Sequence, residues 1–385
     1  MTEKLFYEDS HRTEFTAKVI SCEEAKDGFC VVLDQTAFFP EGGGQYADTG
    51  ILGNTEVTDV HEKNDVIFHS VTTPLEVGSI VSGKINWKER FEKMQQHTGE
   101  HIVSGIVHER FGYNNVGFHL GADYCTMDFD GPISKAQLKE IETAANEAVY
   151  RNLEVEVLYP SKEELKDMDY RSKIEIEGQV RIVKIPGYDV CACCAPHVKR
   201  TGEIGMLKVM NYQNYKGGVR ISILCGFRAL EAFRQKSQII SELMGIFTTN
   251  QEAIIDNVTK LKASNQSLKS ELGSAKAEIL DYKIASLPTD IDNAILFEAD
   301  LDSNAARNCV NKLVEKYSGV SAVFTGNDED GYSFIIGSKN VDCNNIAAAL
   351  RNKLEARGGG KPVMVQGSVK AARNKIERVL DDVLE

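Results

Sequence analysis

The sequence lacks the signals of a membrane or secreted protein. No apolar run approaches the length of a membrane span, and residues 1–10 show no signal-peptide pattern. Fixed-period repeats and low-complexity tracts are also missing. These absences argue against an integral membrane protein, a secreted protein and a repeat array. We therefore expect a cytoplasmic protein that has no membrane partner.

Positive charge is also scarce. Lys and Arg number 44 against 57 Asp and Glu, which gives a net charge of −13. This balance argues against broad, non-specific affinity for nucleic acid. Two segments depart from it: residues 199–220 hold five basic residues and one acidic residue, and residues 351–378 hold eight basic and two acidic residues. A polyanion would have to bind at these segments.

The cysteine pattern does not indicate disulfides. Nine cysteines occur without a secretory signal, which is typical of thiols that bind metal or are buried in a reducing compartment. Three of them, Cys191, Cys193 and Cys194, lie close together in the stretch DVCACCAPHVKRTGEIG. Their spacing is not the Cys-x-x-Cys of a redox motif, so redox chemistry is the weaker interpretation.

The chain is too long for one ordinary core, so two to four domains are expected. Residues 1–88 contain short β-branched and aromatic runs between turn residues, which predicts a small β-barrel. Residues 89–228 mix helical periods with strands, residues 229–288 are helical, and residues 289–385 alternate strands with helices. The expected fold class is α+β: a small N-terminal β-barrel, an α+β domain, a helical hairpin or coiled-coil linker and a C-terminal α/β domain.

The helical region contains a regular apolar stripe. Its positions step alternately by four and three residues, which is typical of a coiled coil. Either an antiparallel hairpin that packs on itself or a dimer seam would account for it. The stripe comprises Ile254, Val258, Leu261, Asn265, Leu268, Leu272, Ala275 and Ile279.

Two pairs of residues predict a metal site. His97 and His101 are separated by one helical turn, so on a helix both imidazoles face one side. Cys193 and His197 have the same spacing as this pair, and Cys193 follows His101 by 92 positions. Nitrogen and thiolate ligands in this number favour tetrahedral Zn²⁺, one ion per chain. His119 is a spare candidate, and it is expected to pack as a strand residue near the site.

Two glycine-rich segments are weaker signals. In residues 36–50, three glycines permit a tight loop whose N–H groups face a ligand, with Gln45 and Asp48 following it. The other segment, residues 356–368, lacks the Gly-Lys-Ser/Thr ending of a P-loop, so ATP binding is not expected. A contact with a nucleic-acid backbone and a simple β-turn both remain open for this segment.

The motifs, taken in order, resemble those of the alanyl-tRNA editing family. FFPEGGGQYADTG is similar to the family's glycine-rich loop, HTGEH to its His-x-x-x-His helix, VGFHLG to the next strand and CCAPHVKRTGEIG to its Cys-x-x-x-His segment. RGGGKPVMVQGS resembles the glycine-rich motif of the C-terminal domain of editing alanyl-tRNA synthetases. The barrel begins near residue 10 with no aminoacylation domain before it, so the resemblance is to a stand-alone editing protein of the long AlaX type.

This resemblance implies a fold and an activity. Residues 89–228 become a zinc-containing editing domain, and residues 289–385 become a domain for tRNA binding and dimerisation. The implied reaction is zinc-dependent hydrolysis of the ester in tRNA(Ala) that carries serine or glycine. A homodimer through the helical and C-terminal regions is expected. A non-catalytic tRNA-binding protein with a structural zinc, and a deacylase for another mischarged tRNA such as a threonine-specific one, remain alternatives.

The resemblance also assigns residues. It makes His97, His101, Cys193 and His197 the zinc ligands, and it places Thr36, Gln45 and Glu100 at the substrate, with Thr36 sensing the serine hydroxyl. The family often has Gly-Gly-Thr where this chain has Cys194, Ala195 and Pro196, which bears on amino-acid selectivity more than on metal binding. The residues expected to contact tRNA are Lys199, Arg200, Arg220, Arg357, Gly358, Gly359, Gly360 and Lys361.

Overall fold

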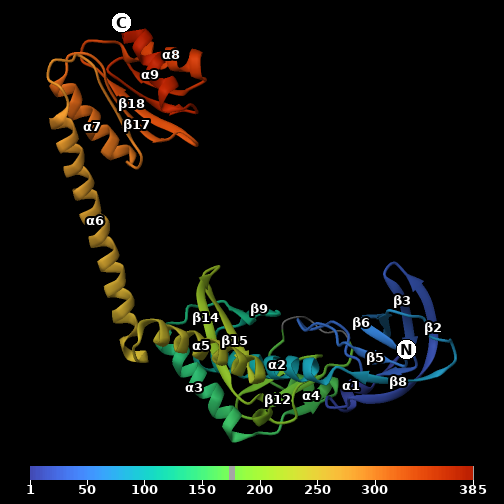
Figure 1. The fold of residues 1–385 in the computed structure, drawn as a ribbon. Coiled ribbons are helices and arrows are strands. Elements are labelled where there is room, and N and C mark those ends of the chain that lie inside the picture. The colour runs from blue at the N-terminus through green and yellow to red at the C-terminus, as the bar shows by residue number, and fades with distance from the viewer. Residues whose placement is uncertain (173–177, 385) are drawn as a thin grey trace. The chain divides into compact units, whose positions relative to one another are not determined.

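The computed structural model describes residues 1–172 and 178–384 and divides into two compact units, Met1–Ile246 and Phe247–Glu385. Both units combine helices with mainly antiparallel sheets, which confirms the predicted α+β class (Figure 1). Within the described residues, no helix combines the length and apolar character that a membrane crossing requires.

The first unit begins with a closed barrel whose strands follow the order β2-β3-β7-β6-β5-β8. Side chains that face inward from the strands fill its core, among them Val31, Val60 and Ile67. The β6–β7 turn consists of Asn64 and Asp65 at φ 51° and 59°, a left-handed pair that these residues tolerate and that matches strand twist. The strands are β2 (Glu14–Ala25), β3 (Gly28–Leu33), β5 (Gly50–Leu52), β6 (Thr55–Lys63), β7 (Val66–Val71) and β8 (Ile80–Ile85). Before them lie β1 (Glu3–Lys4) and α1 (Leu5–Glu8), and β1 pairs with β4 (Gln35–Thr36).

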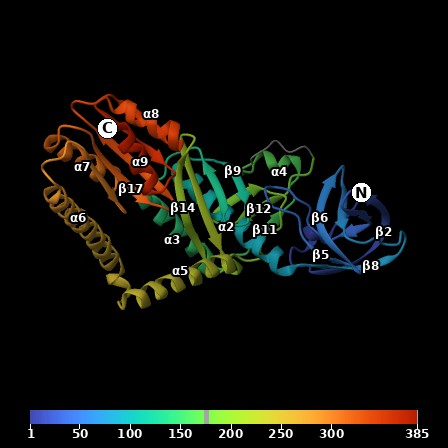
Figure 2. The ribbon, with the colours of Figure 1, turned by 45° about the horizontal axis from the view of Figure 1, so that its top comes forward.

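A long helix, α2 (Trp87–Phe111), follows the barrel and ends at Gly112, whose left-handed φ of 71° closes the last turn. It packs against an antiparallel sheet of order β14-β15-β10-β9 (Figure 2). Helix α3 (Lys135–Arg151) also packs against α2 and is preceded by its N-cap residue Ser134, which forms a capping box with Gln137. The sheet strands are β9 (Asn115–Leu120), β10 (Cys125–Phe129), β14 (Leu207–Tyr215) and β15 (Gly218–Cys225).

A smaller antiparallel sheet, β11-β12-β13, lies against α2 as well and leads into the cysteine-rich segment. Its strands are β11 (Glu156–Leu158), β12 (Ile182–Ile185) and β13 (Asp189–Ala192). The remaining elements of the unit are α4 (Lys162–Lys166), the 3-10 helix η1 (Thr201–Ile204) and α5 (Gly226–Phe247).

The second unit begins with the 3-10 helix η2 (Gln251–Ala253) and the 33-residue helix α6 (Ile254–Ser286). A five-stranded sheet of order β16-β17-β18-β20-β19 follows, with α6 and α7 packed into one apolar cluster and α8 and α9 into the other. The strands are β16 (Ala294–Glu298), β17 (Ser321–Asn327), β18 (Gly331–Gly337), β19 (Arg357–Lys361) and β20 (Met364–Val369). The helices are α7 (Ser303–Lys316), α8 (Cys343–Leu354) and α9 (Arg373–Leu384).

Two sequence expectations gain detail here. The segment with Gly358, Gly359 and Gly360 is not a loop but strand β19. Glycine is needed in it because a Cβ on Gly358 or Gly360 would lie 2.2 Å or 2.3 Å from a carbonyl oxygen of the neighbouring strand β20. The apolar stripe of α6 is exposed along most of its length: Leu261, Leu268, Leu272 and Ile279 are 55–61% exposed.

Candidate metal centre

Helix α2 places His97 and His101 in the interior of the first unit. Both side chains are 2% exposed, and their ring centroids are 5.4 Å apart, as expected for positions one turn apart on a helix. The helix is buried on nearly all sides from Met94 to Val107, so its polar residues need partners within the protein.

Cys193 and His197 lie in the segment that follows β13. Strand β13 pairs with β12 and thereby fixes the start of this segment. Arg181 fixes the continuation, because its guanidinium donates to the carbonyl oxygens of Cys193 and Ala195 at 2.8 and 3.0 Å. The segment is therefore held in one backbone path even though it has no regular structure.

The four residues converge as the sequence predicts. One ligand atom from each of His97, His101, Cys193 and His197 lies within 4.8 Å of all the others. The Cys193 sulfur is 3.5 Å from Nε2 of His97 and 3.4 Å from Nε2 of His197. Tetrahedral zinc, at about 2.1 Å from nitrogen and about 2.3 Å from sulfur, would place these atoms about 3.6 Å apart. The donor set and its spacing therefore fit one zinc ion.

The outer nitrogen of each imidazole has its own partner. Nδ1 of His97 lies 3.1 Å from Oε1 of Gln45, Nδ1 of His101 donates to Asp189 at 2.9 Å, and Nδ1 of His197 lies 3.0 Å from the Thr98 hydroxyl. Such outer partners orient the ring and fix the tautomer in which Nε2 is free to bind metal.

The charges of the cluster suit a cation. Burial alone would raise the pKa of the Cys193 thiol, but the neighbouring imidazoles of His97, His101 and His197 hold that pKa well below its ordinary value. Burial and the neighbouring His101 lower the pKa of His197 to about 3, so this ring is neutral. The thiolate therefore attracts positive charge, which a divalent cation can supply.

The glycine-rich loop of the barrel covers this cluster. Gln45 is buried, with its Oε1 at His97, and its Nε2 group has no hydrogen-bond partner among the residues that the structure describes. A Cβ on Gly44 would lie 2.6 Å from the ring of Phe118, whose centroid is 4.8 Å from that of the His97 ring. A Cβ on Gly43 would lie 3.1 Å from the Cys194 sulfur. Glycine thus lets the loop approach Phe118 and Cys194, which lie next to the predicted ligands, more closely than other residues could.

Glu100 lies beside the cluster and is buried. Its Oε1 accepts hydrogen bonds from Ser104 at 2.7 Å and Asn115 at 2.6 Å. Its Oε2 is 3.8 Å from Nε2 of His101, the nitrogen that faces the cluster. The carboxylate is thus held in place with one oxygen directed toward the predicted ligands.

Thr36 is buried in the barrel, where sequence reasoning missed its partner, His69. Nδ1 of His69 donates to the Val31 carbonyl at 3.1 Å, so the neutral ring presents Nε2 as an acceptor. The Thr36 hydroxyl donates to this Nε2 at 2.9 Å and accepts from the Phe38 N–H at 3.1 Å. Burial lowers the pKa of His69 to about 4, in agreement with a neutral ring.

A buried ion pair joins the barrel to helix α2. Asp48 and Arg90 are each 1% exposed, and Nε of Arg90 donates to Asp48 at 2.8 Å. Asp48 also accepts from the Phe39 N–H at 2.7 Å, and Arg90 donates to the Ala37 carbonyl at 2.7 Å. The sequence motif contained Asp48, but its partner on α2 carried no signal that spacing could reveal.

The other predicted residues lie outside the ligand cluster. His119 is in β9 as expected, but it is exposed rather than packed, and its Nε2 is 3.4 Å from the Tyr46 hydroxyl. Lys199 pairs with Asp9 at 2.8 Å. Arg200 donates to the Asn152 carbonyl at 2.6 Å, and Arg220 makes a two-bond ion pair with Asp128. Of the predicted C-terminal tRNA contacts, Arg357 and Lys361 are exposed at the ends of β19.

Comparison with known proteins gives three matching family models. The model "tRNA synthetases class II (A)" matches residues 2–89, and "Threonyl and Alanyl tRNA synthetase second additional domain" matches residues 180–222. The model "DHHA1 domain" matches residues 290–385. The second match contains Cys193 and His197, and the first contains the glycine-rich loop.

Relatives match over almost the whole chain. The Alanyl-tRNA editing protein AlaX-L of Pyrococcus horikoshii is 27% identical over 100% of this chain and 98% of its own length. The Alanine--tRNA ligases of Methanobrevibacter smithii and Halorubrum lacusprofundi are 27% and 31% identical over 98% and 93% of this chain. The chain spans only 45% and 40% of the length of these two ligases. Over its full length, the chain therefore resembles the alanyl-tRNA editing proteins of the long type, as its motifs predict.

Proposed function

We propose that this chain is a zinc-dependent deacylase that hydrolyses the ester bond of tRNA(Ala) mischarged with serine or glycine. The observation that carries the proposal is the convergence of the four predicted zinc ligands beneath the glycine-rich loop that holds Gln45. The names of the relatives support alanyl-tRNA editing as the broader activity.

Zinc held by His97, His101, Cys193 and His197 would supply a positive charge that anchors the substrate or polarises its ester. The protein residues around it bind and orient. The unpartnered, buried Nε2 group of Gln45 can donate a hydrogen bond to an oxygen of the aminoacyl ester. Glu100, held by Ser104 and Asn115, can accept a proton from a water molecule beside the site.

The test is a deacylation assay with seryl-, glycyl- and threonyl-charged tRNAs, with and without a strong zinc chelator. We expect hydrolysis of the seryl and glycyl esters on tRNA(Ala), loss of activity with chelator and recovery when zinc is restored. Hydrolysis of the threonyl ester alone would instead establish a threonine-specific deacylase. Full activity in a protein shown to be free of zinc would refute the metal's part in the reaction.

A second function is favoured by the ligand count. Four protein ligands are typical of a closed structural zinc site, which would suit a non-catalytic tRNA-binding protein. In the same deacylation assay, such a protein would hydrolyse none of the three esters, with or without chelator. A separate binding measurement would still show affinity for tRNA.

Selectivity for serine is proposed to depend on Thr36. A polar group that pairs with the serine hydroxyl distinguishes it from glycine by about 1–3 kcal/mol, because the wrong substrate leaves the group unpaired. Thr36→Val should lower kcat/KM on seryl-tRNA more than on glycyl-tRNA, whereas Thr36→Ser should keep the ratio. The ratio is informative even for a destabilised variant, because a smaller active fraction lowers both rates equally. An unchanged ratio in Thr36→Val would remove Thr36 from substrate recognition.

The second unit is proposed to bind tRNA and to form the dimer. Arg357 and Lys361 at the ends of the glycine-rich strand are exposed, which is compatible with phosphate contacts. Lys199, Arg200 and Arg220 are proposed as contacts of the first unit. Such contacts are weakened by salt. The affinity for tRNA should therefore fall with ionic strength, and Arg357→Gln combined with Lys361→Gln should make that dependence less steep.

A further inference from the structure

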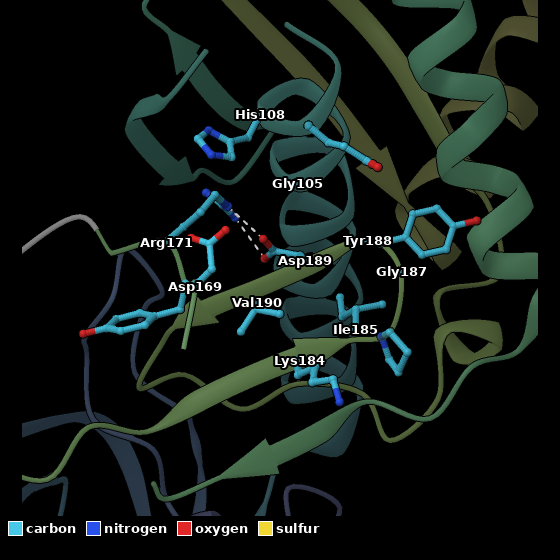
Figure 3. A pocket seen from close by; sticks show the side chains of 13 residues that line it. Gly105, His108, Asp169, Arg171, Lys184, Ile185, Gly187, Tyr188, Asp189 and Val190 are labelled. Carbon is cyan, nitrogen blue, oxygen red and sulfur yellow. Dashed lines mark hydrogen bonds and ion pairs between the residues drawn. The ribbon is translucent and has the colours of Figure 1, made fainter. Parts of the chain in front are cut away.

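The predicted metal ligand His101 is connected to a surface pocket through two charged residues. Its Nδ1 donates to Oδ2 of Asp189 at 2.9 Å, and Asp189 is buried. Arg171 holds both carboxylate oxygens, with Nε 2.7 Å from Oδ1 and the second nitrogen 2.9 Å from Oδ2. Both residues line a pocket of about 290 Å³. Figure 3 shows their paired contact, with His108 and Asp169 near Arg171.

Asp189 is better explained as an orienting group than as a metal ligand. His101, Asp189 and Cys191 also bring their ligand atoms within 4.8 Å of one another, so a second metal arrangement has to be considered. However, the guanidinium of Arg171 already neutralises Asp189, and a cation there would face this positive charge directly. The carboxylate therefore serves His101, whose other nitrogen faces the four-ligand cluster.

Arg171 reaches both halves of the metal site. Its side chain acts through Asp189 on His101, which belongs to α2. Its backbone pairs with β13: the Arg171 N–H donates to the Val190 carbonyl at 2.8 Å, and the Ala192 N–H donates to the Arg171 carbonyl at 2.9 Å. Strand β13 leads directly into Cys193, so one residue constrains a ligand on the helix and a ligand on the loop.

A glycine on α2 makes this contact possible. Gly105 lies one turn after His101, and a Cβ there would lie 2.0 Å from the Tyr188 carbonyl oxygen and 2.9 Å from Cβ of Asp189. Any larger residue would push α2 away from β13 and lengthen the bond between His101 and Asp189. The close approach is therefore built into the packing of the helix against the strand.

We propose that Arg171 and Asp189 are positioning residues of the metal site: Arg171 orients the Asp189 carboxylate, which keeps His101 protonated on Nδ1 and directs its Nε2 toward the metal. This inference rests on the proposed metal site and adds residues to it. Outer partners of this kind commonly change metal affinity by about 10–100-fold.

The experiment measures zinc affinity by competition with a chromophoric chelator in the full-length chain. We expect Asp189→Asn to weaken zinc binding by about 10–100-fold. Arg171→Gln should weaken it in the same direction by a smaller factor, because Asp189 remains as an acceptor. In the cobalt-substituted protein, both variants should alter the visible absorption bands, which report ligand geometry and do not depend on deacylation.

The matched control is Asp128→Asn. Asp128 forms a similar two-bond pair with Arg220, at 2.6 and 2.7 Å, but the contacts described for it include no histidine. We expect wild-type zinc affinity and cobalt bands in this variant. Thermal unfolding of each metal-free variant shows whether it is folded before zinc is added, and affinities are compared for folded proteins only.

Several outcomes would overturn the inference. Zinc binding by Asp189→Asn and Arg171→Gln within twofold of the wild type is one such outcome, and a loss of affinity in Asp128→Asn as large as theirs is another. If Asp189→Asn is unfolded without metal, Arg171→Lys decides, since it keeps the charge but loses the two-bond contact: wild-type affinity and bands would refute the proposal. A wild type that binds zinc but hydrolyses no ester would leave this inference standing while refuting the proposed deacylase.

Discussion

Replacing Thr36 with valine removes a hydroxyl that satisfies two buried groups, Nε2 of His69 and the N–H of Phe38. Valine has nearly the shape of threonine, so the change leaves both groups unpaired without creating a large cavity. Each orphaned group costs about 1–3 kcal/mol, which predicts a loss of about 2–6 kcal/mol in the free energy of unfolding. Denaturant unfolding followed by circular dichroism measures this loss.

Two further variants separate this explanation from a general sensitivity of the barrel. Thr36→Ser keeps the hydroxyl and loses one methyl group, so its loss should be only about 1 kcal/mol. The double variant Thr36→Val with His69→Leu no longer has an unpaired Nε2, so its loss should be smaller than the sum of the single losses by about 1–3 kcal/mol. Additive losses, or a Thr36→Val loss below that of Thr36→Ser, would refute the assigned hydrogen bonds.

Three other predictions follow from the structure. The pKa of His69 is lowered to about 4 from an ordinary 6.5, so His69 takes up a proton in the unfolded chain before it does so in the folded protein as the pH falls. Between pH 6.5 and pH 4 the free energy of unfolding should therefore decrease by up to about 3 kcal/mol more in the wild type than in His69→Leu. Denaturant unfolding at several pH values measures this difference. Arg90→Met leaves Asp48 buried and unpaired and should cost about 3–5 kcal/mol in denaturant unfolding, and adding Asp48→Leu should recover part of that loss. Leu268→Lys, in the exposed stripe of α6, should lower the dimer fraction in sedimentation velocity, whereas Ser270→Lys outside the stripe should not; equal effects would exclude the stripe as the dimer seam.

The sequence predicted what depends on short-range spacing. The two i, i+4 pairs indicated the four residues that converge in the structure. For His97 and His101 helical geometry accounts for this, and for all four the preference of zinc for nitrogen and sulfur was the guide. The order of motifs extended this to the family resemblance. The capping box at Ser134 and Gln137 was predictable for the same reason, since both partners lie within one turn.

What the sequence left open depends on long-range contacts. The partners Gln45, Thr98 and Asp189 reach their histidines across 52, 99 and 88 positions, and no periodicity relates such residues. The same applies to His69, which is 33 positions from Thr36. The glycine-rich segment at Gly358 was expected as a loop because glycine is frequent in turns, but here it serves close contact between strands.

The loop that carries the thiolate is also part of the barrel. Ala195 is fully buried within the apolar cluster of the barrel, and Cys193 packs against both that cluster and the core around α2. Together with the Asp48–Arg90 pair, this joins the barrel to the rest of the compact unit Met1–Ile246. A chimera that exchanged residues 1–88 for the barrel of a relative would therefore change the packing around Cys193 and Ala195, and we expect it to fold better if residues 189–198 are transferred with the barrel.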